Sequence, residues 1–316
     1  MEDVHDVIII GAGPAGCTAA LYASRARLKT LLLDKATVGG PLSRARKVAN
    51  YPGIMGEMAG RDLLALLRKQ AVSFGAKFVR AQVLSTDLNR DIKEVVTTDG
   101  LFKAKAVIVA SGSGDRRDRL PGEMELLGKG VSYCSPCDAP FFKGEEVAVV
   151  GYDDPAVEAA LFATRFAGKV YLVCPAPKLA VLPQNENAVA EEAKIELICG
   201  CMLKEIKGED TVVSIILSGR NGQRELAVSG VFLYLGGCQP AVDFLDDIIK
   251  FHEKGYILAG PLDMSTSLPG VYAAGDVRWH ELKQAIIAAS DGATAALAVD
   301  KYIHRRERMR SQHGAR

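Results

Sequence analysis

The sequence predicts an α/β fold made of two Rossmann-like dinucleotide-binding domains. Largely apolar runs at residues 7–10, 30–33 and 146–150 are typical of strands that are buried on both faces of a parallel sheet. Two of these runs lead directly into a glycine-containing turn followed by a helical stretch, at residues 11–16 and 151–156. The length of 316 residues, with 48% hydrophobic side chains, is sufficient for two such domains.

The first turn carries the complete dinucleotide-binding fingerprint. Its three glycines are Gly11, Gly13 and Gly16. They allow the tight turn and the close approach of a pyrophosphate, whose charge is favoured at the N-terminus of the helix expected over residues 17–27. The second strand ends at Asp34, eighteen residues after Gly16, where a carboxylate can accept hydrogen bonds from ribose hydroxyls. Strand, helix, second strand and acid in register favour a nucleotide site over a glycine-rich turn in an ordinary βαβ unit.

The second turn carries a degraded version of the same fingerprint. Gly151 and Ala156 stand at the first and third glycine positions, but Asp153 occupies the middle one. A carboxylate there would face the phosphates of a bound dinucleotide, and like charges in a partly desolvated site are costly. After the next expected strand, residues 169–173, Lys178 offers a single ammonium where an arginine fork is the better ligand for a 2′-phosphate.

Cys134 and Cys137 form a Cys-x-x-Cys pair that is followed directly by Asp138, a potential proton donor. Such a pair can close a disulfide within one turn, and a helix beginning there would lower the pKa of a thiol. Pro136 suits a first helical turn because its missing N–H costs nothing there. From these residues alone, half a zinc site and a pair of buried structural cysteines stay open as alternatives. A zinc site would need two more clustered ligands, whereas the other five cysteines are scattered: Cys17, Cys174, Cys199, Cys201 and Cys238.

Further segments complete the expected order of elements. Strands are expected at residues 106–110, 231–235 and 270–274, each leading into a glycine turn, and a linker is expected at residues 120–122. The last expected element is an alanine-rich helix over residues 281–302, after which the basic run at residues 305–310 is expected to be a solvated tail.

Composition excludes several classes of protein. The formal net charge of +1 gives no global field that would favour nucleic acid or a membrane surface. No apolar run approaches the roughly 20 residues of a membrane span, and the N-terminus has acids where a signal peptide has basic residues. An odd count of seven cysteines argues against a secreted disulfide scaffold. The sequence therefore predicts a cytoplasmic, enzyme-like protein.

Together these motifs resemble the thioredoxin reductase family, the low-molecular-weight flavoprotein disulfide reductases, and the similarity covers nearly the whole chain. The segment G-V-S-Y-C-S-P-C-D at residues 130–138 is similar to the family's G-V-S-Y-C-A-T-C-D. The other matching segments are residues 11–16 (the FAD pyrophosphate loop), 39–42 (G-G-Q-L), 50–53 (N-Y-P-G), 111–123 (T-G-A to L-P-G-E) and 274–277 with 283–285 (G-D-V and R-Q-A).

The resemblance implies a discontinuous FAD-binding domain, residues 1–118 and 242–316. An inserted NAD(P)H-domain-like domain, residues 119–241, would carry the Cys-x-x-Cys pair. The resemblance also implies a homodimer, and it implies no metal site. The residues that would hold FAD are Gly11, Gly13, Pro14, Ala15, Gly16, Asp34, Gly40, Leu42, Asn50, Ser111, Gly112, Gly275, Asp276, Lys283, Gln284 and Ala285.

The resemblance also implies catalytic roles. Cys137 would be the sulfur nearest the flavin, and Cys134 would be the thiol that attacks the disulfide of a thioredoxin-like partner. Asp138 would protonate the leaving thiolate. Trp279 and His280 follow the Gly-Asp motif and either border the flavin or have a surface or packing role.

The chain departs from the NADPH-using members of the family in the second domain. G-Y-D-D-P-A at residues 151–156 replaces their G-G-G-D-S-A, and C-P-A-P-K at residues 174–178 replaces their H-R-R-x-x-x-R. In both places the chain looks more like NADPH-independent members, which take electrons from ferredoxin. The resemblance therefore implies FAD as the cofactor, argues against NADPH binding and favours a ferredoxin-like donor. The basic residues expected to dock an acidic ferredoxin are Arg116, Arg117, Arg305 and Arg306.

Three hypotheses compete at this point. The leading one is an FAD-dependent disulfide oxidoreductase with a protein donor. The second is an NADPH-dependent thioredoxin reductase with an altered nucleotide site. The third is a flavoprotein that has lost turnover and acts as a redox sensor. Both cysteines and Asp138 are retained beside the flavin motifs, which argues against the third.

Overall fold

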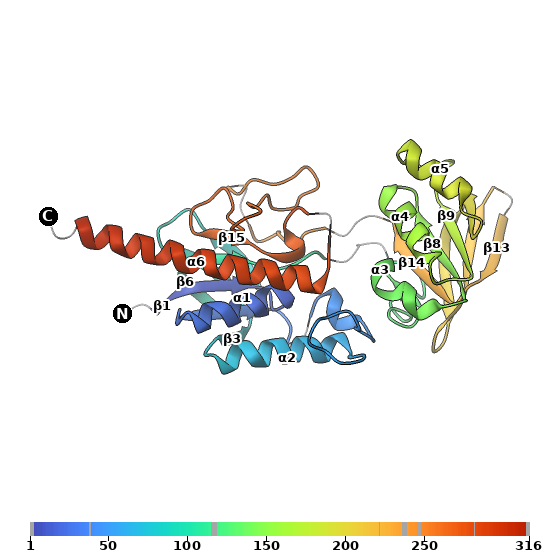
Figure 1. Ribbon diagram of the computed structural model, residues 1–316. Helices are drawn as coiled ribbons and strands as arrows, with labels where there is room; N and C mark the ends of the chain where they lie inside the picture. Colours follow the sequence, from blue (N-terminus) through green and yellow to red (C-terminus); the bar gives the residue numbers. More distant parts are fainter. Residues whose placement is uncertain are drawn as a thin grey trace. The chain divides into compact units, whose positions relative to one another are not determined.

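A computed structural model describes residues 3–37, 39–114, 119–220, 222–235, 239–245, 248–280 and 282–313. The chain divides into two compact units (Figure 1). The first unit comprises residues 1–45, 51–115 and 238–316, and the second comprises residues 46–50 and 116–237. Each unit contains a largely parallel sheet with helices, so the predicted α/β class with two Rossmann-like folds is confirmed.

The first unit is built on one mixed sheet. Its described strands are β1 (Val4–Ile10), β2 (Thr30–Asp34), β3 (Lys77–Arg80), β4 (Val83–Asp87), β5 (Lys93–Thr97), β6 (Gly100–Val109) and β15 (Val271–Ala273). Their order is β3-β2-β1-β6-β5-β4, and β15 pairs with the C-terminal half of β6. The strands β1, β2, β3 and β15 run parallel to β6, whereas β4 and β5 are antiparallel neighbours. Val7, Ile8 and Ile9 are completely buried, as expected of a central parallel strand.

The helices of the first unit pack closely where the two ends of the chain meet. They are α1 (Pro14–Arg25), α2 (Gly60–Ser73) and α6 (Ala285–His313), with the 3₁₀ helices η1 (Pro41–Arg44) and η3 (Gly275–Val277). Figure 1 shows α1 and α6 side by side. A Cβ atom on Gly292 would lie 2.0 Å from the carbonyl oxygen of Ala15, so only glycine allows the two helices to approach this closely.

The second unit contains a parallel sheet and a smaller antiparallel one. The parallel sheet has the order β10-β9-β8-β14-β7. These strands are β7 (Val131–Ser132), β8 (Glu146–Gly151), β9 (Lys169–Cys174), β10 (Ile195–Cys199) and β14 (Gly230–Tyr234). The antiparallel sheet consists of β11 (Met202–Gly208), β12 (Val212–Gly219) and β13 (Gly222–Ala227). The helices are α3 (Ser135–Asp138), α4 (Asp154–Ala163) and α5 (Pro183–Glu191), with the 3₁₀ helix η2 (Ala139–Phe142).

The last helix differs from its prediction at both ends. Instead of residues 281–302, α6 spans Ala285–His313. Residues 282–284 precede it without helical structure, and the Lys283 ammonium donates a hydrogen bond to the Tyr256 hydroxyl at 2.7 Å. The basic run at residues 305–310, which was predicted as a solvated tail, continues the helix. One of its arginines, Arg306, pairs with the Asp91 carboxylate at 2.7 Å. Neither α6 nor any other helix in the described ranges is long and apolar enough to cross a membrane.

Candidate active site

The turn between β1 and α1 is open at its middle glycine. Gly11 has φ +107°, and a Cβ atom on it would lie 2.3 Å from the Ala110 carbonyl oxygen. A Cβ atom on Gly16 would lie 1.7 Å from the Gly11 carbonyl oxygen. These two glycines are therefore required by the packing of the chain itself. A Cβ atom on Gly13 would meet nothing within 4 Å, so this glycine leaves room for a group that is not part of the chain.

The start of α1 follows this open position, and the first N–H groups of a helix have no partner within the helix. Gly13 is the N-cap residue and provides no side-chain hydrogen bond, and Pro14 occupies the first helical turn. The Ala15 side chain is buried against the helix crossing with α6. A pyrophosphate is an anion that the free N–H groups and the helix dipole favour here.

Asp34 lies at the C-terminal end of β2, beside the same turn. One oxygen of its carboxylate accepts a hydrogen bond from the Ala12 N–H at 2.7 Å, and the other accepts one from the Ala36 N–H at 2.9 Å. These two bonds fix the orientation of the carboxylate. Its remaining lone pairs can accept hydrogen bonds from the hydroxyls of a ribose.

The turn at Gly275 is fastened to α6 by an ion pair that the sequence did not predict. The Gly275 N–H donates to the Asp291 carboxylate at 3.0 Å. The Arg278 guanidinium donates to the same carboxylate through two bonds, of 2.6 and 2.9 Å. Asp291 is almost completely buried. The sequence signal for this ion pair is Asp291 itself, an acidic residue among the small residues of an alanine-rich helix.

Asp276 and His280 are left with unsatisfied polar atoms. Oδ1 of Asp276 and Nε2 of His280 are buried, and neither has a hydrogen-bond partner within the described part of the chain. They lie 3.9 Å apart. Burial raises the pKa of Asp276, although the charge of Lys283 opposes the shift, and burial lowers the pKa of His280. A hydroxyl from a bound ligand would satisfy Oδ1 of Asp276.

These features of the first unit fit FAD. The turn at Gly13 can take its pyrophosphate, Asp34 can take its ribose, and the unpartnered oxygen of Asp276 can take a hydroxyl of its ribityl chain. The other residues predicted to hold FAD are distributed over several loops of the chain.

Two of these loops have a well-defined backbone. The Ser111 hydroxyl donates to the Ala241 carbonyl oxygen at 2.6 Å, and the Ala241 N–H donates to the Gly112 carbonyl oxygen at 3.0 Å. Gly40 has φ +79° and immediately precedes η1, which contains Leu42. The Ser111 bonds therefore join the end of β6 to the segment that returns from the second unit.

The remaining predicted FAD residues lie in different places. Asn50 is exposed and belongs to residues 46–50, which group with the second unit. Gln284 precedes α6 and its carbonyl oxygen accepts a hydrogen bond from Ala288, while Ala285 begins the helix. Trp279 is partly exposed and stacks on His252 with ring centroids 3.7 Å apart. Trp279 therefore packs against the His252 ring.

Cys134 and Cys137 form a disulfide in the second unit, with Cα atoms 5.3 Å apart. Cys134 is the N-cap residue of α3, and Pro136 lies in its first turn, as the sequence predicted. No group of three or more possible metal ligands occurs among the described residues, so the zinc alternative has no support there. Burial raises the pKa of the Cys17 thiol to about 12 and that of Cys174 to about 11, which makes both poor nucleophiles.

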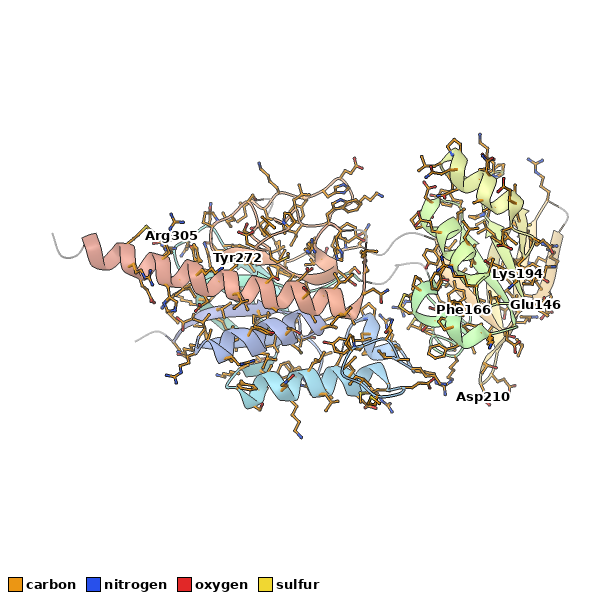
Figure 2. All side chains as sticks on the ribbon, viewed as in Figure 1. Glu146, Phe166, Lys194, Asp210, Tyr272 and Arg305 are labelled. Carbon is orange, nitrogen blue, oxygen red and sulfur yellow. A yellow bond between two sulfur atoms is a disulfide. The ribbon has the colours of Figure 1, made fainter. Side chains whose placement is uncertain are left out.

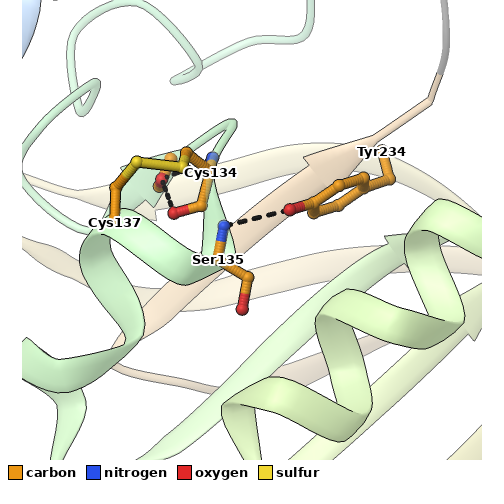
Figure 3. The surroundings of a disulfide bond; sticks show 5 residues. Cys134, Ser135, Cys137 and Tyr234 are labelled. Atoms are coloured by element: carbon orange, nitrogen blue, oxygen red, sulfur yellow. Dashed lines mark hydrogen bonds between the residues drawn. A yellow bond between two sulfur atoms is a disulfide. The ribbon is translucent and has the colours of Figure 1, made fainter. Parts of the chain in front are cut away.

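Two hydroxyl groups anchor the backbone N–H groups of Cys134 and of the residue after it (Figure 3). The Ser132 hydroxyl accepts a hydrogen bond from the Cys134 N–H at 3.0 Å. The Tyr234 hydroxyl accepts one from the Ser135 N–H at 3.0 Å. Sequence reasoning did not identify Ser132 or Tyr234, because both are ordinary residues of apolar strands until the fold brings them to the disulfide.

Asp138 is placed to hold a proton beside the disulfide. Burial raises the pKa of its carboxyl group, although a hydrogen bond with Ser132 works in the opposite direction. A carboxyl group with a raised pKa keeps its proton at higher pH than an exposed one. This is the property that a donor to a departing thiolate needs.

The second glycine-containing turn is occupied by the chain itself. Asp153 is the N-cap residue of α4, and its carboxylate accepts a hydrogen bond from the Ala156 N–H at 3.3 Å. The position at which a dinucleotide would place its pyrophosphate therefore already holds a negative charge.

The segment that follows β9 is hydrogen-bonded to the same turn. The Ala180 N–H donates to the Tyr152 carbonyl oxygen at 2.7 Å, and Ala180 forms an isolated β-bridge with Asp153. The Asp154 carboxylate accepts hydrogen bonds from the Leu182 N–H at 3.0 Å and from the Asn185 amide at 2.7 Å. The two carboxylates of this turn thus satisfy groups of their own chain.

The chain is similar to thioredoxin reductases in both sequence and structure. The sequence matches the family model described as pyridine nucleotide-disulphide oxidoreductase over residues 5–292. It is 47% identical to a thioredoxin reductase of Aquifex aeolicus (strain VF5), over 98% of this chain and 96% of that protein. The crystal structure of thioredoxin reductase from Streptococcus pyogenes MGAS5005 matches with a TM-score of 0.91 at 33% identity, covering 96% of this chain and 100% of that one. A ferredoxin-flavin thioredoxin reductase from Clostridium acetobutylicum matches with a TM-score of 0.52 at 27% identity, covering 95% and 98%.

Proposed function

The chain belongs to the thioredoxin reductase family of flavoprotein disulfide oxidoreductases, and from that membership we propose its donor and acceptor. The donor is a ferredoxin-like protein and not NADPH. The acceptor is the disulfide of a thioredoxin-like protein. The observation that carries the choice of donor is the Asp153 carboxylate at the N-terminus of α4.

FAD is the cofactor that the first unit would hold. When bound, it supplies the two-electron reduction of a disulfide. The open turn at Gly13 would receive its pyrophosphate, Asp34 its adenosine ribose and Asp276 its ribityl chain. Arg278 and Asp291 would keep the Gly275 turn in place for that contact.

The reduced Cys134–Cys137 pair would carry out the exchange with the acceptor. The Cys134 thiolate attacks one sulfur of the acceptor disulfide, and the other acceptor sulfur leaves with a proton from Asp138. The Cys137 thiolate then attacks Sγ of Cys134. This step re-forms the intramolecular disulfide and releases the second acceptor sulfur as a thiolate, which takes up a proton from solvent. The raised pKa of Asp138 supports its role as the proton donor.

NADPH binding would require changes in the second unit. Its pyrophosphate would have to displace the Asp153 carboxylate from the Ala156 N–H and then lie beside two carboxylates, Asp153 and Asp154. Such like-charge contacts disfavour the complex. For a 2′-phosphate, the segment after β9 offers the exposed Lys178 and no arginine.

The structure describes two of the four basic residues that the sequence analysis expected to dock the donor. Arg116 and Arg117 lie outside the described residues. Arg306 is paired with Asp91. Arg305 is exposed but lies far along α6 (Figure 2). It is about 30 Å from Ala285, at a rise of 1.5 Å per residue. We therefore do not include Arg305 and Arg306 in the proposed donor surface.

Other properties of the family are part of the proposal. We expect a homodimer, which sedimentation of the purified protein would test. We also expect a cytoplasmic location. Domain boundaries at residues 118/119 and 241/242 predict that limited proteolysis cuts near those positions. The first boundary lies at the edge of residues 115–118, which are outside the described residues.

One anaerobic titration tests the donor. The flavin absorbance of the purified holoprotein is followed during addition of NADPH and then of photoreduced ferredoxin. We expect ferredoxin to reduce the flavin stoichiometrically and NADPH to reduce it slowly or not at all. Rapid, stoichiometric bleaching by NADPH would overturn the donor assignment and favour an NADPH-dependent enzyme with an altered nucleotide site. A protein that cannot be reconstituted with FAD would contradict the cofactor assignment.

A second measurement separates an enzyme from a redox sensor. The wild-type protein, reduced by its donor, should reduce thioredoxin repeatedly. The variant Cys134→Ser should still accept electrons at the flavin but should not reduce thioredoxin, because the attacking thiol is missing. Flavin reduction without any thioredoxin turnover in the wild type would favour the sensor.

A further inference from the structure

Tyr234 links the second glycine-containing turn to the disulfide of the second unit. It is the last residue of β14, where it pairs with Gly151 of β8. A Cβ atom on Gly151 would lie 2.8 Å from the Tyr234 carbonyl oxygen, so the backbone of Tyr234 is held tightly against the second glycine-containing turn. Its side chain extends from there to the disulfide, where the hydroxyl meets the Ser135 N–H at 3.0 Å (Figure 3).

We propose that Tyr234 is a positioning residue for the disulfide exchange, an inference that rests on the proposed role of Cys134 and Cys137. Its hydroxyl holds the peptide between Cys134 and Ser135. In this way it keeps the two sulfur atoms within bonding reach when the disulfide is reduced.

The peptide that Tyr234 holds is the point at which the Cys-x-x-Cys segment changes conformation. Cys134 is extended, with φ −140° and ψ 95°, and α3 begins at the next residue. The Ser132 hydroxyl holds the N–H on the other side of Cys134. Ser135 is completely buried, and its own hydroxyl donates to the Ala159 carbonyl oxygen at 2.9 Å. Without Tyr234, the Ser135 N–H would be buried with no partner, which is costly.

The restraint matters most when the covalent bond is absent. In the mixed disulfide between Cys134 and the acceptor, the Cys137 thiolate must reach Sγ of Cys134. The new Cys134–Cys137 bond forms as the bond to the acceptor breaks, and the acceptor sulfur leaves as a thiolate that takes up a proton. A turn that is already in the closed geometry makes this ring closure faster and favours the disulfide over the dithiol.

Tyr234 stays neutral while its hydroxyl holds the Ser135 N–H. Burial raises the pKa of its hydroxyl, the negative charge of Asp138 raises it further, and the hydrogen bond from Ser135 opposes the shift. The hydroxyl therefore keeps its proton over the pH range of the reaction.

The test is the variant Tyr234→Phe, in which the ring remains and the hydrogen bond is lost. The equilibrium between dithiol and disulfide is measured by thiol labelling in dithiothreitol redox buffers. We expect a shift of about fivefold toward the dithiol, which for two electrons is about 20 mV. Release of the acceptor thiol from the mixed disulfide, measured in a single turnover, should slow by roughly tenfold. Flavin content and flavin reduction by the donor should stay at wild-type values.

A matched control is Tyr171→Phe, in β9 of the same sheet, two strands away from β14. The Tyr171 hydroxyl donates to Glu146 at 2.7 Å and has no role at the disulfide. We expect Tyr171→Phe to lower the melting temperature about as much as Tyr234→Phe does and to leave the equilibrium between dithiol and disulfide unchanged. If Tyr234→Phe also lowers only the stability, with equilibrium and release rate at wild-type values, the proposal is wrong.

Ser135 allows the same bond to be removed from its other end. Ser135→Pro deletes the N–H, and Ser135→Ala deletes only the bond to Ala159. Combined with Tyr234→Phe, Ser135→Pro should add little further shift, because both changes remove one bond. Fully additive shifts would contradict the proposal. Thiol labelling needs neither the electron donor nor thioredoxin. If ferredoxin proves not to be the donor, this measurement therefore still tests the role of Tyr234. If Ser135→Pro does not fold, Tyr234→Phe alone tests that role.

Discussion

The two glycine-containing turns of this chain have the same architecture and opposite electrostatics. In the first, a Cβ atom at the middle position would meet nothing within 4 Å, and no side chain caps α1. In the second, the corresponding residue is Asp153, whose carboxylate caps α4. The first unit also leaves Oδ1 of Asp276 without a partner in the described ranges, whereas the Asp154 carboxylate of the second unit has two.

The difference shows how one βαβ scaffold can lose a ligand without losing its fold. The N-terminus of a helix favours an anion in either case. A cofactor provides that anion from outside the chain, and an N-cap carboxylate provides it from inside. An aspartate at the middle position therefore stabilises α4 while it competes with a dinucleotide. The same substitution in the first turn should have the same two effects.

Gly13→Asp would make the first turn like the second and should have the largest effect. We expect a loss of FAD affinity of more than 100-fold, because a carboxylate would occupy the place of the pyrophosphate. The φ of −71° at Gly13 suits any residue, so the fold should be retained. The measurement is the ratio of flavin to protein absorbance after purification, with circular dichroism to check the fold.

Gly13→Ala is the matched control for that variant. It adds a Cβ atom without a charge, and the chain has room for it. We expect a smaller loss of FAD affinity, due only to contact with the cofactor. Tight FAD binding by Gly13→Asp would show that the pyrophosphate does not use this turn.

Asp276→Asn tests the unsatisfied carboxylate of the first unit. A hydrogen bond to a charged group contributes about 1.5–3 kcal/mol, so we expect FAD affinity to fall by roughly 10- to 100-fold. Flavin release is measured by the recovery of its fluorescence. Asp263→Asn is the control, since Asp263 is an exposed acid of the same unit that bonds only within its own turn. Equal release rates for Asp276→Asn and the wild type would remove Asp276 from the cofactor site.

Asp153→Gly would make the second turn like the first and should have a smaller effect. We expect the affinity for NADPH to rise by about tenfold, with little loss of stability, because glycine is also accepted at an N-cap. The Asp154 carboxylate remains and the segment after β9 still has no arginine, so full NADPH-dependent activity should not appear. Calorimetric titration gives the affinity. Asp153→Asn keeps the cap and removes the charge, so it separates charge repulsion from occupancy of the helix end.

The sequence predicted those features that depend on local patterns. The largely apolar runs predicted β1, β2, β8 and β9, because a strand period is decided by neighbouring residues. The Cys-x-x-Cys spacing allowed a disulfide, and the family resemblance favoured it over the zinc and structural alternatives. Features that depend on distant residues were missed. Tyr234 reaches Ser135 across 99 positions of sequence, and Arg278 pairs with Asp291 only because α6 folds back on the Gly275 turn. The predicted start of α6 was wrong for the same reason, because Lys283 bonds to the distant Tyr256 before the helix begins.

Asp138→Asn concerns a carboxylate of the second unit that, unlike Asp153, does not cap α4. Burial raises its pKa, so the native state binds this proton more tightly than the unfolded chain does. The contribution of Asp138 to stability is therefore complete below about pH 4, near the pKa of the unfolded chain, and is lost as the pH rises through the native pKa. Asparagine carries no charge at any pH. We expect the melting temperature of the variant to equal that of the wild type near pH 4 and to exceed it by a few degrees at pH 8, while thioredoxin reduction slows by roughly 100-fold.

Asp210→Asn, which changes an exposed acid of the same unit, should show no such pH-dependent difference. A difference in melting temperature that shrinks with rising pH would mean that the native state prefers the Asp138 carboxylate in its charged form, and the proton-donor role would then have to be given up.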